Sequence, residues 1–147
     1  MRRQGIDWID NQQRVQDIHI DALSRVCTQI CADFHFQLAQ VVFTILSDEE
    51  LWMMNVKHLN HDTLTDVITF PYIQGSFIRG EIFISADRAA DNAVRNNTTQ
   101  HDELVRYAIH GVLHLNGLND STPEEKETIH RFEDQYLNLY HLFHVKQ

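Results

Sequence analysis

The chain has 147 residues, of which 43% are hydrophobic and 22% charged, and its formal net charge is −9 at pH 7. These values are typical of one globular domain, residues 1–147, with a buried core. The negative charge excludes broad, charge-driven binding to nucleic acid, DNA included, but it allows a local basic cleft. No apolar run approaches the roughly 18 residues of a membrane span, and the start lacks the apolar core of a signal peptide, so we expect a cytoplasmic protein without membrane contact.

The first part of the chain alternates between strand and helix patterns. Residues 5–9 alternate as in a short strand, and apolar side chains recur at helical spacing from Arg14 to Phe34. The β-branched run at 36–46 predicts a second strand. Ser47 and Glu50 then form a capping box, which predicts a helix that runs to about Leu59.

Two further strands are predicted at residues 66–73 and 79–85, joined by a turn around residues 74–76. Pro71 cannot donate a ladder hydrogen bond, so the first of these strands lies near an edge or ends there. Strands with helices between and after them indicate an α+β fold, in which helices pack on a small mixed β-sheet.

Three helices are predicted in the second half of the chain. Ser85 or Asp87 opens one that reaches about Asn96, and residues 97–99 cap the next. Thr122-Pro-Glu-Glu125 caps the last helix, with proline at the first helical position. One face of that last helix carries an apolar stripe of Ile129, Phe132, Tyr136, Leu139 and Phe143.

The two cysteines, Cys27 and Cys31, lie four residues apart in a helical pattern. Leu23, Ile30 and Phe34 share their face, so we interpret them as buried thiols rather than as a redox or metal-binding pair.

Two histidines, His110 and His114, also lie four residues apart in a helical pattern, so their imidazoles can converge on one point. With 10 histidines in the chain, such a pair arises roughly 0.7 times by chance, and the pair alone is a weak signal. The helix is apolar nearly all round, however, and is therefore predicted to be buried. Buried imidazoles need a partner, which is either a hydrogen bond or a metal ion.

A carboxylate, that of Asp120, follows the histidine pair in the sequence within reach of the same metal ion. Gly117 is the residue type that ends helices in a left-handed conformation, and the turn would bring Asp120 back towards the histidines. Thr122 already caps the next helix, which leaves the carboxylate of Asp120 free. His110, His114 and Asp120 together suit a catalytic Zn²⁺ that keeps its fourth position for water, although such ligands also accept Ni²⁺.

These residues carry a resemblance to a known family. His110-Gly-Val-Leu-His114-Leu-Asn-Gly117-Leu-Asn-Asp120 resembles the H-G-x-L-H-L-x-G-Y-D-H signature of the YbeY family, which are bacterial zinc-dependent, single-strand-specific endoribonucleases. Thr65-Asp-Val-Ile-Thr-Phe-Pro71 resembles the family's T-D-V-L-S-F-P, and Gly80-Glu-Ile-Phe-Ile-Ser85 its G-D-I-x-I-S. The resemblance implies one zinc ion and cleavage of ribosomal RNA, in 16S 3′-end maturation and ribosome quality control at the small subunit.

Two positions depart from the family pattern. The third histidine of the family falls on Asp120, which is a competent zinc ligand but leaves the metal a slightly weaker Lewis acid. A family arginine implicated in catalysis falls on Leu59, which cannot stabilise phosphate charge. Lys57, His58 and Arg79 are the nearest substitutes, and Arg79 is our preferred phosphate contact.

Three groups of residues leave alternatives open. Gly111 occupies the position of the glutamate base in H-E-x-x-H peptidases, which argues against a peptidase; close packing on a strand, room for substrate, or both explain this glycine. Phe70 and Tyr72 are interpreted as core residues, with base stacking as the alternative. The remaining histidines, including His58, His61, His141 and His144, are interpreted as surface or helix-end residues rather than as ligands.

The expected function is that of a metal-dependent endoribonuclease acting on ribosomal RNA. Leu59 and the charge of −9 favour one alternative, a non-catalytic RNA- or ribosome-associated factor with a structural zinc ion. A metallohydrolase with a different substrate is the other alternative.

Overall fold

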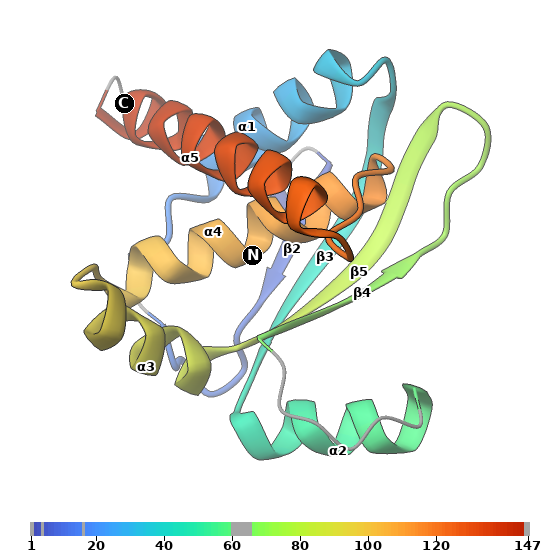
Figure 1. The fold of residues 1–147 in the computed structure, drawn as a ribbon. Helices are drawn as coiled ribbons and strands as arrows, with labels where there is room; N and C mark the ends of the chain where they lie inside the picture. The colour runs from blue at the N-terminus through green and yellow to red at the C-terminus, as the bar shows by residue number, and fades with distance from the viewer. Residues whose placement is uncertain (1, 4, 16, 60–65, 146–147) are drawn as a thin grey trace.

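The computed structural model describes residues 2–3, 5–15, 17–59 and 66–145. Its centre is a mixed sheet of five strands in the order β1-β2-β3-β5-β4 (Figure 1). The strands are β1 (Arg2–Arg3), β2 (Ile6–Ile9), β3 (Gln37–Leu46), β4 (Val67–Pro71) and β5 (Phe77–Ser85). Strand β3 runs parallel to β2 and β5, whereas β1 and β4 pair antiparallel with their neighbours.

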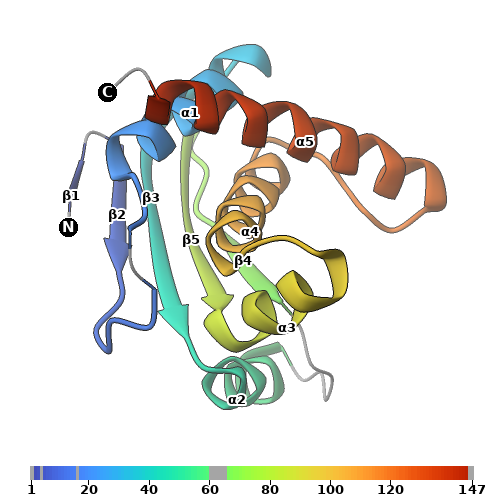
Figure 2. The ribbon, with the colours of Figure 1, turned by 90° about the vertical axis from the view of Figure 1, so that its left-hand side faces the viewer.

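Five helices accompany the sheet in the described part of the chain: α1 (Ile20–Asp33), α2 (Asp48–Leu59), α3 (Ala86–Asn96), α4 (Gln100–Leu115) and α5 (Pro123–Val145). Helices α1, α4 and α5 gather on one side of the sheet, and α2 lies beyond the end of the strands (Figure 2). The predicted α+β fold with a mixed sheet is therefore confirmed. None of these helices has both the length and the apolar character needed to cross a membrane.

The predicted helix caps are present. Ser47 and Glu50 exchange hydrogen bonds as a capping box at the start of α2. The side chain of Ser85 accepts the N–H of Arg88 at the start of α3. Thr99 caps α4 in the same way. Each of these caps depends on residues three positions apart, which is why the sequence pattern predicts them.

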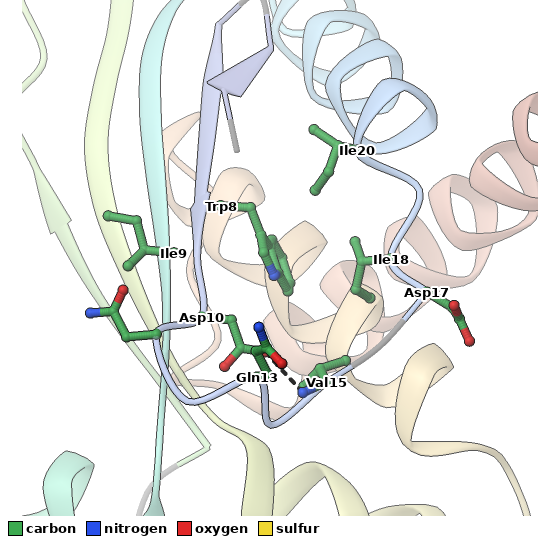
Figure 3. A pocket seen from close by; sticks show the side chains of 9 residues that line it. Trp8, Ile9, Asp10, Gln13, Val15, Asp17, Ile18 and Ile20 are labelled. Atoms are coloured by element: carbon green, nitrogen blue, oxygen red, sulfur yellow. Dashed lines mark hydrogen bonds between the residues drawn. The ribbon is translucent and has the colours of Figure 1, made fainter.

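Helix α1 begins later than its apolar periodicity predicts. The pattern indicates a helix from Arg14, but α1 starts at Ile20. The carboxylate of Asp10 accepts the backbone N–H groups of Arg14 and Val15 at 2.9 and 2.8 Å, so these groups are held in a loop. Figure 3 shows the pocket that this loop borders, and Trp8, Val15 and Ile18 are among the side chains that line it. The apolar residues before α1 thus pack as a loop, and this part of the prediction was wrong.

Three further predictions have definite outcomes. Cys27 and Cys31 are buried free thiols, as predicted, and burial raises the pKa of both. Tyr72 is 54% exposed, so its interpretation as a core residue was wrong. Pro71 is the last residue of β4, which is the edge strand of the sheet, as its chemistry predicts.

Helix α4 is the central helix, and glycines bring it close to the sheet. A Cβ built on Gly111 of α4 would lie 2.7 Å from Cδ1 of Ile82 in β5, and one built on Gly80 of β5 would lie 2.7 Å from Cδ2 of Leu115. Both glycines therefore allow an approach that any side chain would prevent. Close packing accounts for Gly111, and it fixes the second half of α4 on β5.

Candidate metal centre

Helix α4 and the turn after it bring together the three side chains that the sequence singles out. His110 and His114 project from one face of the last turns of α4, and their Nε2 atoms are 2.9 Å apart. Oδ2 of Asp120 lies 3.4 Å from Nε2 of His110 and 3.5 Å from Nε2 of His114. In the described part of the chain, these three residues form the one group of His, Cys, Asp or Glu side chains with the geometry of a metal site.

The turn after α4 explains how Asp120 reaches the histidines. Gly117 adopts φ +99°, and its N–H donates to the carbonyl of His114 at 3.0 Å. The N–H of Leu118 donates to the carbonyl of Leu113 at 3.1 Å. This pair of hydrogen bonds is a Schellman motif, which reverses the chain at the end of the helix. Thr122 exchanges cap hydrogen bonds with Glu125, so the carboxylate of Asp120 is not used as a cap.

The partners of the two imidazoles decide where their lone pairs point. Nδ1 of His110 lies 2.6 Å from Oε2 of Glu133, and Nδ1 of His114 lies 2.8 Å from the carbonyl oxygen of Leu118. Both partners are acceptors, so each neutral imidazole carries its hydrogen on Nδ1. The two Nε2 lone pairs and the carboxylate of Asp120 therefore face one another. Three electron-pair donors at such distances repel unless a cation lies between them.

The spacing of the three atoms fits a metal ion. Ligand atoms bound tetrahedrally at about 2.0–2.1 Å lie about 3.3 Å from one another, close to the three observed separations. Two imidazoles and one carboxylate are also a recurring ligand set for zinc that keeps a position open for water. The residues present thus fit a divalent ion in both chemistry and spacing.

A second layer of charged residues connects the site to α5. Oε1 of Glu133 accepts a hydrogen bond of 3.1 Å from Nη1 of Arg106, and Oδ1 of Asp134 accepts one of 2.7 Å from Nη2 of the same side chain. Burial alone would lower the pKa of Arg106, but the bonds to Asp134 and Glu133 hold it above its ordinary value. No sequence motif singled out Arg106 or Glu133. The available signal was a glutamate on the buried face of α5, beside Ile129 and Tyr136.

Comparisons with known proteins identify the family of this chain. The family model described as "Endoribonuclease YbeY" matches residues 8–141. The chain belongs to the YbeY family. The protein "Endoribonuclease YbeY" of Bacteroides thetaiotaomicron is 39% identical over 110 residues, which cover 75% of this chain and 80% of that relative. The protein of the same name from Amoebophilus asiaticus is 46% identical over 102 residues, covering 69% of each. The one from Parabacteroides distasonis is 34% identical over 129 residues, covering 84% of this chain and 91% of that relative.

A solved structure has a similar fold. The solution structure of TM1509 from Thermotoga maritima superposes with a TM-score of 0.62 at 22% identity, covering 92% of this chain and 88% of that one. At this identity the likeness concerns the fold alone. The region that the family model matches, residues 8–141, contains the histidine pair, the turn and Asp120.

The structure does not bring Arg79 into the metal group. Arg79 is an exposed residue of β5 between Ile78 and Gly80. Side chains alternate along a strand, and Gly80 and Ile82 face α4, so Arg79 projects from the opposite face of the sheet. Leu59 is the last residue of α2. Its side chain, that of His58 and residues 60–65, including His61, lie outside the described part.

Other residues considered in the sequence contact groups outside the metal site. Nε2 of His141 lies 3.1 Å from Oδ1 of Asp102, and the ring of His144 lies against that of His19 with 3.6 Å between centroids. Phe70 is half-buried and packs edge-on against Phe83.

Proposed function

We propose that this protein is a zinc-dependent, single-strand-specific endoribonuclease whose single domain, residues 1–147, acts in maturation of the 16S ribosomal RNA 3′ end and in ribosome quality control. Membership of the YbeY family supports the reaction class. Metal binding is supported by one observation, the convergence of three electron-pair donors on one point. Ni²⁺ is the alternative ion, because imidazole and carboxylate bind both. The proposed location is the cytoplasm, and the proposed partner is the small ribosomal subunit.

His110, His114 and Asp120 are the proposed metal ligands. When bound, the ion supplies an acidified water molecule and positive charge for the phosphodiester. The two histidines present their Nε2 atoms because Glu133 and the Leu118 carbonyl hold the opposite nitrogens. Gly111 argues against peptide hydrolysis, because it stands where a zinc peptidase carries its glutamate base and it packs on Ile82 instead.

Arg79 is the proposed phosphate contact, at a distance from the metal ligands. Its side chain is exposed and forms no ion pair with another described residue. Because it projects from the face of the sheet opposite α4, the RNA strand would have to cross the edge strand β4 to reach it. The contact is therefore proposed for a nucleotide beyond the cleaved bond.

A non-catalytic RNA- or ribosome-associated factor with a structural zinc ion is the second candidate. Leu59 at the position of the family arginine and the net charge of −9 are the observations that favour it. A metallohydrolase with another substrate remains the third.

Cleavage of a single-stranded RNA separates these candidates. We expect metal-loaded protein to cut the RNA, and we expect chelation or His114→Ala to abolish cutting. His141→Ala is the matched control, because His141 is a partly exposed histidine of α5 that contacts Asp102 and lies outside the ligand group. Zinc binding without cleavage under any condition would favour the structural role. Cleavage of a phosphodiester analogue but not of RNA would favour the third candidate.

A further inference from the structure

Glu133 is an unusual residue for its place in the fold. It is buried on the inner face of α5, where the neighbouring buried residues are Ile129, Tyr136 and Tyr140. A carboxylate at such a position costs several kcal/mol unless charged or hydrogen-bonding partners offset the desolvation. Its presence therefore requires an explanation from its partners.

Each oxygen of Glu133 has one partner on α4. Oε1 accepts from Arg106 at 3.1 Å, and Oε2 accepts from Nδ1 of His110 at 2.6 Å. Arg106 also reaches Asp134, the next residue of α5. The guanidinium thus binds two consecutive carboxylates, but of these two only Glu133 also accepts a hydrogen bond from a proposed metal ligand.

The other two ligands are held differently. His114 donates to a neutral backbone carbonyl, that of Leu118. Asp120 is 42% exposed, and its carboxylate makes no hydrogen bond to a described residue other than its contacts with the two histidines. In the described part of the chain, His110 is therefore the only one of the three that donates a hydrogen bond to a charged acceptor, and such bonds are roughly twice as strong as neutral ones.

We propose that Glu133, fixed by Arg106, is a positioning residue of the metal centre: it holds the hydrogen of His110 on Nδ1, aims Nε2 at the ion and makes this imidazole a better electron donor. The proposal rests on the proposed metal site but not on RNA cleavage. Carboxylates behind metal-bound histidines fix the tautomer and orientation of the ring, and removing them typically costs 10–100-fold in metal affinity.

The competing explanation is that Arg106 and its two acids only join α4 to α5. Asp134→Asn tests this explanation, because Asp134 makes the shorter bond to Arg106 and does not touch His110. A purely structural link predicts similar effects for Glu133 and Asp134. A positioning role predicts an effect on metal binding for Glu133 alone.

The experiment measures zinc affinity by competition with a chelator, and the thermal unfolding of the metal-free full chain, for wild type, Glu133→Gln, Glu133→Met and Asp134→Asn. We expect affinity to fall about tenfold in Glu133→Gln, which keeps an acceptor, and about 100-fold in Glu133→Met. Asp134→Asn should bind zinc as wild type does. Nitrogen chemical shifts of His110 in the metal-free protein should show the Nδ1–H form in wild type, and a shift towards Nε2–H in Glu133→Met.

Three results would overturn the proposal. They are wild-type affinity in Glu133→Gln and Glu133→Met, an equal loss in Asp134→Asn, and an unchanged His110 tautomer. If Glu133→Met does not fold, the near-isosteric Glu133→Gln decides alone, through its zinc affinity relative to wild type and Asp134→Asn. Wild-type protein that binds no divalent ion would refute the metal site itself, whereas protein that binds zinc but cuts no RNA would refute only the endoribonuclease assignment.

Discussion

Gly111→Ala tests whether close packing of α4 on β5 sets the position of the metal ligands. The new Cβ would lie 2.7, 2.9 and 3.0 Å from Cδ1, Cγ2 and Cγ1 of Ile82, a fully buried residue. Because Cγ1 and Cγ2 belong to a branched side chain anchored on the sheet, rotation of the terminal methyl cannot relieve all three contacts. The helix or the strand must move.

The expected magnitude follows from two opposing effects. Overpacking a core typically costs 1–3 kcal/mol, and three close contacts place this case at about 2–3 kcal/mol. Replacing a mid-helix glycine by alanine returns about 1 kcal/mol of helix propensity. We therefore expect the free energy of unfolding of the metal-free protein to fall by about 1–2 kcal/mol. Zinc affinity should fall as well, because His110 precedes the displaced residue.

Chemical denaturation measures this change, and Ile82→Ala supplies the control background. That substitution removes all three contacting atoms, so Gly111→Ala should stabilise the Ile82→Ala protein by about 1 kcal/mol through propensity alone. Stabilisation by Gly111→Ala in the wild-type background would refute the packing argument. A double variant that recovers zinc affinity but not RNA cleavage would assign the glycine a second role, as room for substrate.

Three further predictions concern single residues. Asp120→Ala should lower zinc affinity by more than the roughly 10–100-fold expected for losing a residue that only hydrogen-bonds a metal ligand. Wild-type affinity in a calorimetric titration would show that Asp120 is not a ligand. Leu59→Arg should raise the rate of RNA cleavage without changing zinc affinity. An unchanged rate would mean that another cationic side chain already stabilises the phosphate charge. Burial lowers the pKa of His101 below 6.5, so unfolding takes up a proton; the stability that the neutral imidazole contributes is fully present above about pH 6.5 and is lost as the pH falls. In His101→Gln, the free energy of unfolding measured in urea should therefore differ less between pH 7.5 and 5.5 than in wild type. An equal difference in both proteins would contradict this role of His101.

The sequence alone determined the features that depend on near neighbours. The caps at Ser47, Ser85, Thr99 and Thr122 each link residues three positions apart, and the turn at Gly117 depends on one backbone conformation. The convergence of the two histidines follows from the helix period, because their rings are four residues apart on one face.

Tertiary structure decided what depends on distant partners. Periodicity extends the first helix back to Arg14, but the carboxylate of Asp10 takes those backbone groups into a loop. No local pattern shows that Glu133 lies behind His110, 23 residues earlier in the chain, because the contact exists only where α5 crosses α4. The sequence also does not show whether Arg79 lies on the same face of the sheet as the metal ligands. Alternation along a strand establishes only that Arg79 and Gly80 lie on opposite faces. The packing of Gly111 on Ile82 decides that α4 lies on the side of Gly80, because a helix can approach the strand closely only where no side chain intervenes.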